Sequence, residues 1–418
     1  MSPTASWTLE QGMVQLGSIV GPENTELRGE TIVAAPGEAQ QIAEILRFAQ
    51  ANGLAVTPIG GGTKIGWGNP VVADIQLSLA RLNALREHAW QDMTCTVEAG
   101  CTWTTMQSEL ARHGQMVALD PLWPDRATVG GIVASNDSGT LRLKFGGLRD
   151  LIIGMTIVLA DGTIARTGGK VVKNVAGYDL HKLITGSFGT LGVIAEVNFR
   201  LHPLEEHART WAVIAHDDGH PVAASFAAPL RALMDSQIIP SCVQVRTSQQ
   251  ECALDIRIAA VPECLDEYAT RIRSVFDEFA VTESSEAVWQ ARQQLFDKND
   301  AIVLKVTLLP TAICAVSSEL QKIASAEGLR TAAVAQANGL TTVALNSAPD
   351  AAIALIERLR ARAAGFGGSL VALQIPDSLR GRLNVWGPDP GSLNLMREIK
   401  RRFDPLHTLN PGRFVGNI

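Results

Sequence analysis

The pattern of apolar and polar residues predicts a strand, a helix and a second strand near the start of the chain. Residues 30–34 have the composition of a strand, and over residues 38–52 the apolar side chains recur at helical spacing. Residues 53–56 form a short apolar run typical of a buried strand. We therefore predict a βαβ unit, preceded by a helical leader over residues 1–27.

Further elements follow, with one long interruption. Before residue 205 the predicted strands are residues 74–78, 94–99, 151–159 and 195–201, and the predicted helix is residues 104–113. Residues 120–147 contain many turn-forming residues and little periodicity. A loop-rich stretch of this length is usually functional, so we predict a functional loop region there.

The character of the sequence changes after residue 205, where glycine-rich loops give way to alternating strands and helices. The clearest are strands at residues 211–215, 242–246 and 253–259 and helices at residues 265–279 and 351–364. This succession predicts a β-α-β-β-α-β motif within residues 208–375. The predicted parts of this α+β chain are residues 1–27, 28–205, 206–375 and 376–418.

Composition indicates a soluble globular protein. Of 418 residues, 46% are hydrophobic and 19% charged, and the formal net charge of −6 disfavours nucleic-acid binding, which needs a concentrated basic face. The longest apolar run, residues 151–160, is too short to span a membrane, and no signal peptide is visible. The six cysteines form no C-x-x-C pair. We predict free thiols and a cytoplasmic location, with any membrane association made through a partner subunit.

The segment with the clearest chemistry reads Thr57-Pro58-Ile59-Gly60-Gly61-Gly62-Thr63-Lys64-Ile65-Gly66-Trp67-Gly68. Without Cβ atoms, consecutive glycines can adopt positive φ angles and direct their N–H groups at one point, forming an anion-binding nest. Thr63 would add a hydroxyl and Lys64 a positive charge. The glycine run alone also fits an ordinary turn. Its spacing excludes the dinucleotide fingerprint, because Ile65 stands where a glycine is required, and Val171 after Gly169-Lys170 excludes the Walker motif.

Four segments occur in an order and spacing that resemble a known family. They are residues 57–68, 128–139 and 186–194 and the closing Asn410-Pro411-Gly412, with a further likeness at residues 173–179. Together they resemble the FAD-binding flavoproteins of the vanillyl-alcohol-oxidase / p-cresol-methylhydroxylase (PCMH) superfamily. Within it, the chain looks most like the FAD-binding subunits of bacterial glycolate oxidases. The likeness is clear over residues 28–205 and in the last residues of the chain, and weak over residues 206–392.

This resemblance implies a two-part PCMH-type FAD-binding domain, an α+β (ferredoxin-like) second domain, and a C-terminal tail that returns to the FAD domain. The residues implied to hold the FAD pyrophosphate are Ile59, Gly60, Gly61, Gly62, Thr63 and Lys64. Those implied to line the ribityl chain and isoalloxazine are Thr128, Gly130, Gly131, Ala134, Asn136 and Gly139. The resemblance places the adenine end of FAD beside Gly192, Val193 and Ile194. It also implies that Asn410 approaches the flavin from the tail.

Relatives that attach FAD covalently place a histidine or cysteine near the flavin loops. Residues 57–68 and 120–150 contain neither, so we predict non-covalent FAD. The larger 2-hydroxyacid dehydrogenases of the superfamily carry a histidine-rich metal site, and no matching segment occurs in this sequence. We therefore expect no metal, and the resemblance assigns no catalytic acid or base.

The resemblance implies a subunit of an FAD-dependent oxidoreductase that oxidises a small 2-hydroxy acid, such as glycolate or D-lactate, by hydride transfer to flavin N5. Iron–sulfur clusters need grouped thiolates, which this sequence lacks, so electrons would pass to a separate iron–sulfur subunit in a complex with a larger flavoprotein chain. Two alternatives stay open. One is a non-catalytic FAD-carrying assembly subunit of such a complex, and the other is a flavoreductase that uses NAD(P)H.

Overall fold

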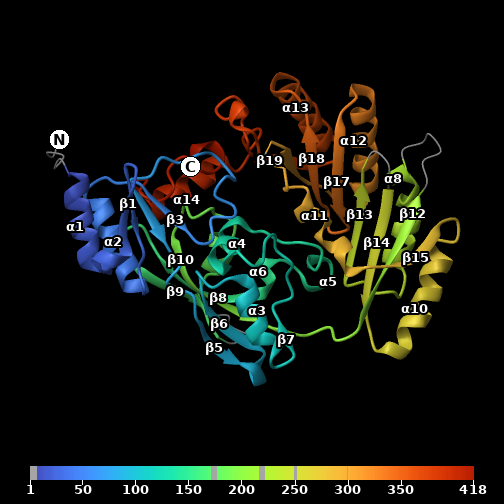
Figure 1. Ribbon diagram of the computed structural model, residues 1–418, viewed down its shortest axis with the longest axis horizontal. Helices are drawn as coiled ribbons and strands as arrows, with labels where there is room; N and C mark the ends of the chain where they lie inside the picture. The colour runs from blue at the N-terminus through green and yellow to red at the C-terminus, as the bar shows by residue number, and fades with distance from the viewer. Residues whose placement is uncertain (1–6, 171–176, 216–221, 249–251, 299) are drawn as a thin grey trace. The chain divides into compact units, whose positions relative to one another are not determined.

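The computed structural model describes residues 7–170, 177–215, 222–248, 252–298 and 300–418 (Figure 1). Its contacts divide the chain into two compact units. The first unit consists of Met1–Ser138, Gly147–Leu204 and Pro388–Ile418. The second unit consists of Gly139–Gly146 and Glu205–Gly387.

The first unit begins with a four-stranded sheet in the order β1-β2-β4-β3. Its strands are β1 (Thr25–Arg28), β2 (Thr31–Ala34), β3 (Val56–Ile59) and β4 (Ile75–Ser78). β4 pairs in parallel with β2 and β3, so it separates the two strands of the predicted βαβ unit. The helices beside this sheet are α1 (Leu9–Val20), which contacts β1 and β2, and α2 (Ala39–Ala51), which packs on α1 (Figure 1).

β3 begins three residues later than the sequence pattern predicts, because the turn that caps α2 extends through Gly53 to Leu54. Gly53 has a φ of 67°, and the Leu54 N–H donates to the Ala49 carbonyl at 2.9 Å. This arrangement satisfies a carbonyl at the helix C-terminus, as glycine commonly allows.

The second sheet of the first unit has five antiparallel strands in the order β5-β6-β10-β8-β9. They are β5 (Leu85–Ala89), β6 (Thr94–Glu98), β8 (Ile152–Val158), β9 (Ile164–Gly168) and β10 (Val193–Arg200). The smaller elements are α3 (Trp103–Ala111), α7 (Leu180–Ile184) and the short pair β7 (Gln115–Met116) and β11 (His202–Pro203). One hydrophobic core joins both sheets, since it includes Ile75 and Val97.

The loop region predicted over residues 120–147 is partly helical. It contains α4 (Val129–Ser135) and the single-turn helix α5 (Arg142–Phe145), and a second single-turn helix, α6 (Leu148–Leu151), follows directly after it. Thr128 is the N-cap of α4, and its Oγ1 accepts the Gly131 N–H at 3.4 Å. These helices are too short to show a periodic apolar pattern, which explains the incorrect prediction of loop.

The second unit contains two β-α-β-β-α-β motifs joined in one eight-stranded sheet, whereas the sequence predicted a single motif. The strand order is β15-β12-β14-β13-β17-β18-β16-β19, and neighbours are antiparallel. The first motif has β12 (Ala208–Ala215), α8 (Val222–Ser225), α9 (Ala227–Asp235), β13 (Cys242–Thr247), β14 (Cys252–Ala259), α10 (Pro262–Val275) and β15 (Ala280–Ser284). The second has β16 (Ile302–Thr307), α12 (Ile313–Glu327), β17 (Arg330–Gln336), β18 (Leu340–Asn346), α13 (Pro349–Gly365) and β19 (Ser369–Gln374), with α11 (Ala291–Gln294) preceding it.

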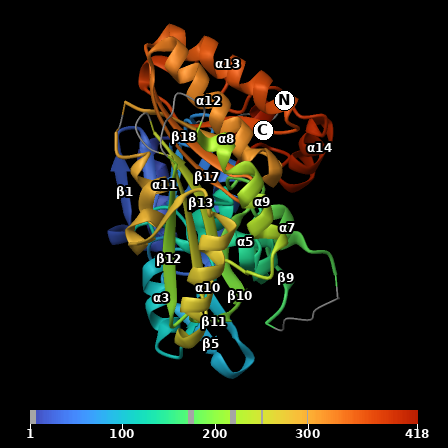
Figure 2. The same cartoon turned by 90° about the vertical axis from the view of Figure 1, so that its right-hand side faces the viewer.

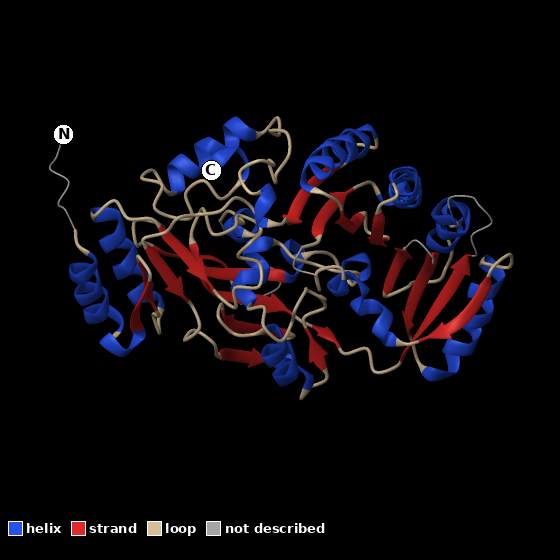
Figure 3. Cartoon of the chain, turned by 45° about the horizontal axis from the view of Figure 1, so that its top comes forward, coloured by secondary structure: helices blue, strands red, loops and turns tan. Residues whose placement is uncertain are grey.

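The two faces of this sheet differ in character. Helices lie along one face (Figures 2 and 3), where alternate strand residues such as Leu254 and Ile256 enter the hydrophobic core. The intervening residues of the same strand, Asp255 and Arg257, point to the opposite face, because successive strand residues alternate. That opposite face is therefore partly polar.

The unit boundaries differ from the sequence-based ones in two places. Residues 139–146 were assigned to the first domain and residues 376–387 to the tail, yet both segments belong to the second unit. In the first case α5 contacts β13, and Lys144 forms a 2.9 Å ion pair with Glu205. Contacts between segments distant in sequence decide both assignments, so composition could not reveal them.

The C-terminal tail returns to the first unit through α14 (Leu393–Phe403). Lys400 of α14 is almost completely buried, and its Nζ lies 2.6 Å from Asp404 Oδ2. The same ammonium donates to the carbonyls of Thr190 and Leu409, each at 2.8 Å. Asp404 in turn accepts the backbone N–H of Leu409. This buried pair thus fastens the tail to the segment that precedes β10.

All six cysteines are free thiols. Among the helices in the described ranges, none combines the length and apolar character needed to cross a membrane.

We predict that Lys400→Met lowers the free energy of unfolding by about 3–5 kcal/mol, because it leaves the Asp404 carboxylate buried without its counter-charge. Urea denaturation followed by circular dichroism measures the change. Arg402→Met is the matched control: Arg402 lies on the same helix in an exposed pair with Glu398, and its loss should cost at most about 1 kcal/mol. Equal effects of the two substitutions would contradict this role of Lys400.

Candidate cofactor site

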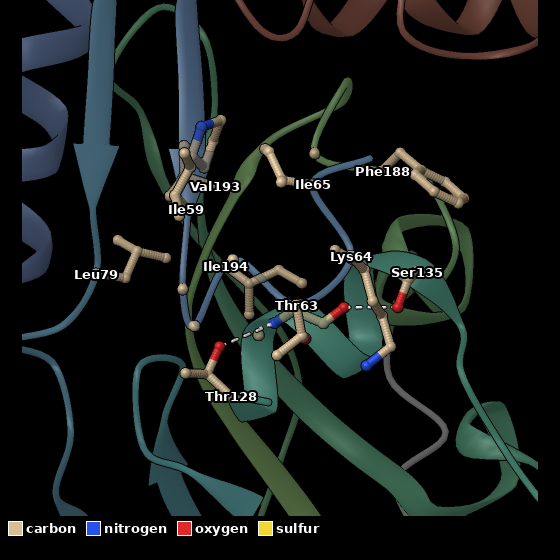
Figure 4. Close-up of a pocket in the computed structure, with 18 of the residues that line it drawn as sticks. Ile59, Thr63, Lys64, Ile65, Leu79, Thr128, Ser135, Phe188, Val193 and Ile194 are labelled. Atoms are coloured by element: carbon tan, nitrogen blue, oxygen red, sulfur yellow. Dashed lines mark hydrogen bonds between the residues drawn. The ribbon is translucent and has the colours of Figure 1, made fainter. Parts of the chain in front are cut away.

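A pocket in the first unit brings together three segments that lie far apart in the sequence (Figure 4). The end of β3 and the glycine loop after it form one wall, α4 forms a second, and the segment leading into β10 forms a third. The C-terminal tail adds Arg413. The pocket therefore lies at the carboxyl end of a parallel strand, where α/β sheets commonly bind ligands.

The three glycines of the loop are required for two different reasons. A Cβ on Gly60 would lie 2.0 Å from Thr128 Oγ1, and one on Gly61 would lie 1.8 Å from the Arg126 carbonyl oxygen. These two glycines thus allow the loop to pack directly against the chain before α4. Only Gly62 has a positive φ, 69°, and a Cβ there would meet nothing within 4 Å. The sequence analysis explained the glycine run by positive φ angles, and this explanation holds only for Gly62 among the three.

The second wall is held in place by local hydrogen bonds around Gly131. Thr128 Oγ1 accepts the Gly131 N–H, and Ser135 Oγ donates to the Gly131 carbonyl at 2.7 Å (Figure 4). On the opposite side of α4, a Cβ on Gly130 would lie 2.8 Å from Ala99 Cβ. Small residues therefore let the helix sit close to both β6 and the pocket.

The third wall contains two consecutive residues with left-handed backbone. Phe188 has a φ of 56° and Gly189 a φ of 70°, and both line the pocket. Positive φ is costly for a bulky residue and persists only where neighbouring contacts enforce it. Here the Asn410 side chain donates from Nδ2 to the Phe188 carbonyl at 2.8 Å. The wall continues through Gly192, Val193 and Ile194 into β10.

Lys64 lines the pocket, but its charge is already balanced. Its Nζ lies 3.2 Å from Asp137 Oδ2, and both side chains are buried. The rings of Trp67 and Trp123 lie 5.7 Å and 5.3 Å from the same ammonium. The Asp137 carboxylate also accepts the Leu122 N–H at 2.8 Å. The positive charge expected from Lys64 at the glycine loop is thus paired with the Asp137 carboxylate.

Most residues predicted from the sequence line this one pocket, and three do not. Asn136 is the C-cap of α4, with a φ of 49°, and Asn410 supports Phe188 from behind the wall. Gly139 belongs to the second unit, where its carbonyl accepts from Asn338 Nδ2 at 3.0 Å. The predicted residues that do line the pocket are Ile59, Gly60, Gly61, Gly62, Thr63, Lys64, Thr128, Gly130, Gly131, Ala134, Gly192, Val193 and Ile194.

The pocket also contains residues that the sequence did not single out. They are Pro58, Ile65, Leu79, Ser135, Phe188, Gly189 and Arg413. All except Leu79 lie within or directly beside the segments that carried the family resemblance, so that resemblance could have included them. Leu79 follows β4 and has no such signal. Residues 173–176, which also supported the resemblance, lie outside the described residues.

Comparison with known families identifies the cofactor. Residues 31–168 match the "FAD binding domain" family, and residues 387–414 match "FAD linked oxidases, C-terminal domain". The chain contains an FAD-binding domain. The first match covers the glycine loop and α4, and the second ends just after Arg413, so both families meet at the pocket described above. These matches support FAD as the cofactor of this chain.

Curated relatives share parts of the sequence. The chain is 36% identical to glycolate oxidase subunit GlcD of Bacillus subtilis over 43% of its own length and 38% of that protein. It is 33% identical to mitochondrial D-lactate dehydrogenase [cytochrome] 1 of Saccharomyces cerevisiae over 46% of its length and 33% of that protein. The chain thus spans well under half of these two relatives. An uncharacterized FAD-linked oxidoreductase of Mycobacterium tuberculosis, Rv2280, is 28% identical over 92% of this chain and 90% of its own.

Solved structures show that the fold is of the PCMH type. p-Cresol methylhydroxylase superposes with a TM-score of 0.77 and 16% identity, covering 98% of this chain and 97% of that one. An alkyldihydroxyacetonephosphate synthase gives a TM-score of 0.71 and 17% identity, covering 98% and 86%. The predicted combination of a PCMH-type domain with an α+β second domain is confirmed at the level of fold.

We predict that Gly61→Ala weakens FAD binding by at least about tenfold, because its Cβ would displace either the glycine loop or the chain at Arg126. Overpacking of this kind should also cost about 1–3 kcal/mol of stability. Titration of the apoprotein with FAD, followed by flavin fluorescence, measures the affinity. Gly391→Ala is the control, since a Cβ at this exposed glycine meets nothing within 4 Å. Wild-type affinity in the Gly61 variant would show that close packing at this point is unimportant.

Proposed function

We propose that this chain is a subunit of an FAD-dependent oxidoreductase that converts a small 2-hydroxy acid into the 2-oxo acid. The pocket formed by the FAD-binding domain is the observation that carries the proposal. The names of the relatives support the substrate class, because one is a glycolate oxidase subunit and another a D-lactate dehydrogenase.

The residues of the pocket fit FAD in shape and chemistry. The three glycines of the loop line the pocket without adding side chains, as an anion nest for a diphosphate requires. Ile59, Leu79 and Val193 offer apolar surface for a planar ring, and the hydroxyls of Thr63 and Ser135 offer polar contacts. When bound, FAD supplies the acceptor for the hydride and its electrons. The chain's own part is to hold the cofactor and exclude water from it.

We infer that the FAD is held without a covalent bond. Among the pocket-lining residues of the described chain there is no cysteine or histidine, the side chains that could form such a bond. Thr63 in the glycine loop cannot take that role.

Precipitation of the holoprotein with acid should therefore release all of the flavin into the supernatant, where its absorbance can be measured. Thr63→Ala should leave this result unchanged, since no bond to this residue is involved. Flavin that stays with the precipitated protein would disprove non-covalent binding.

For the substrate carboxylate we propose a cluster on the polar face of the second unit's sheet. Lys305 lies directly opposite Thr342 in the register of β16 and β18. Its neighbours Leu304 and Val306 enter the core beneath the helices, so Lys305 points to the other face. Arg292 of α11 reaches the same place, with Nε 3.4 Å from Thr342 Oγ1. Two positive charges and a hydroxyl on this face of the sheet suit a carboxylate.

We predict that Arg292→Gln raises KM for the 2-hydroxy acid by about 10- to 100-fold, as expected for the loss of a charged hydrogen bond. FAD affinity should not change, because Arg292 does not line the cofactor pocket. Steady-state kinetics with an artificial electron acceptor give KM and kcat separately. Arg271→Gln is the control, because Arg271 is an exposed residue of α10, away from the cluster. An unchanged KM in the Arg292 variant would remove this residue from the substrate site.

Electrons would leave this chain for a separate iron–sulfur subunit, within a complex that also contains a larger flavoprotein chain. The relative named as a glycolate oxidase subunit supports such an assembly. The purified chain should then bind FAD and turn over poorly without an added electron acceptor. Full turnover by the isolated chain would overturn the requirement for a partner.

Anaerobic bleaching of the flavin absorbance tests the function itself. Glycolate or D-lactate should bleach the bound flavin, and NADPH should not. If only NADPH bleaches it, the chain is a flavoreductase. If the chain binds FAD and no donor bleaches it, a role as a non-catalytic FAD-carrying subunit replaces the enzymatic proposal.

A further inference from the structure

Arg413 occupies a defined position beside the glycine loop. Its Nη2 donates to the carbonyls of Lys64 and Ile65, each at 3.2 Å. The backbone around it is fixed to the same loop, since the Asn69 N–H donates to the Arg413 carbonyl at 2.9 Å. The Asn69 side chain also donates to the Gly412 carbonyl at 2.9 Å. The tail thus presents Arg413 to the pocket through bonds to the loop that forms its first wall.

The guanidinium is a buried positive charge on the lining of the pocket. Only 7% of Arg413 is exposed, and its Cζ lies 5.9 Å from the ring centre of Phe188, another lining residue. Burial lowers the pKa of Arg413 to about 10, so the group stays protonated at neutral pH. Lys64, the other cation of this wall, is matched by Asp137. Arg413 therefore adds a second buried cation to the lining, brought there by the tail.

We propose that Arg413 binds the diphosphate of FAD, together with the backbone N–H groups of the glycine loop. This inference rests on the proposed FAD site. A guanidinium carries five N–H donors in one plane, so an arginine that bonds backbone carbonyls through one nitrogen can present others to phosphate oxygens. The diphosphate would then meet partial positive charges from the loop and a full charge from the tail. The cofactor site would remain incomplete until the tail has docked.

A purely structural role for Arg413 makes a different prediction. If its only task is to fasten the tail to the glycine loop, its loss should weaken the binding of every ligand of the pocket alike. A role in diphosphate binding should affect only ligands that carry phosphate groups. ADP and adenosine separate the two roles, because both contain the adenosine part of FAD and only ADP contains the diphosphate.

The experiment compares Arg413→Gln with the wild type by calorimetric titration with ADP, adenosine and FAD. The variant should bind ADP and FAD about 10- to 100-fold more weakly, while its affinity for adenosine should stay within about twofold. Arg397→Gln is the matched control, because Arg397 lies on the same tail, is exposed, and does not line the pocket. Equal losses for ADP and adenosine, or no loss for ADP, would overturn the proposal.

Two further measurements keep the result interpretable. Arg413→Lys retains the charge, so it should keep a preference for ADP over adenosine even if Arg413→Gln proves unstable. Loss of that preference in the lysine variant, with the fold preserved by circular dichroism, would count against a charge-based role. A wild-type protein that binds neither FAD nor ADP would instead refute the cofactor site itself.

Discussion

The site depends on one steric constraint, the direct contact between the glycine loop and the chain that leads into α4. At Gly60 and Gly61 there is no room for a Cβ against Thr128 and the Arg126 carbonyl. The first two walls of the pocket are therefore built on each other. Any side chain at these positions would separate them and change the shape of the pocket. Glycine here serves packing between segments more than turn formation.

The tail completes the pocket from the far end of the sequence. The buried Lys400–Asp404 pair holds the carbonyls of Thr190 and Leu409, and Asn410 supports the left-handed backbone at Phe188. Lys400, Asp404, Thr190, Leu409 and Asn410 are all buried, so their bonds replace contacts with water that folding removed. The segment before β10 and the last residues of the chain consequently form a single structure. The family match at residues 387–414 covers these tail residues.

Charge in the pocket is distributed differently from what residue types suggest. The lysine that follows the glycines faces a buried aspartate, whereas an arginine near the C-terminus lines the pocket. A buried carboxylate without a partner would be costly, so Asp137 requires the lysine where it is. The pocket thus has two buried cations, one paired with Asp137 and one bonded to the backbone of the glycine loop.

The sequence by itself determined the cofactor family and most of one pocket, because the glycine loop, residues 128–134 and residues 192–194 are local motifs whose composition can be read directly. It also indicated a second α+β domain. Only the tertiary structure decided that residues 139–146 join that domain and that the domain contains two β-α-β-β-α-β motifs. It also decided that the charge of Lys64 is paired with Asp137 and that Arg413 reaches the pocket from the tail. Each of these depends on contacts between residues far apart in the chain, such as Lys64 with Asp137 and Arg413 with Ile65. Local patterns of polarity and secondary-structure propensity do not reveal such pairings.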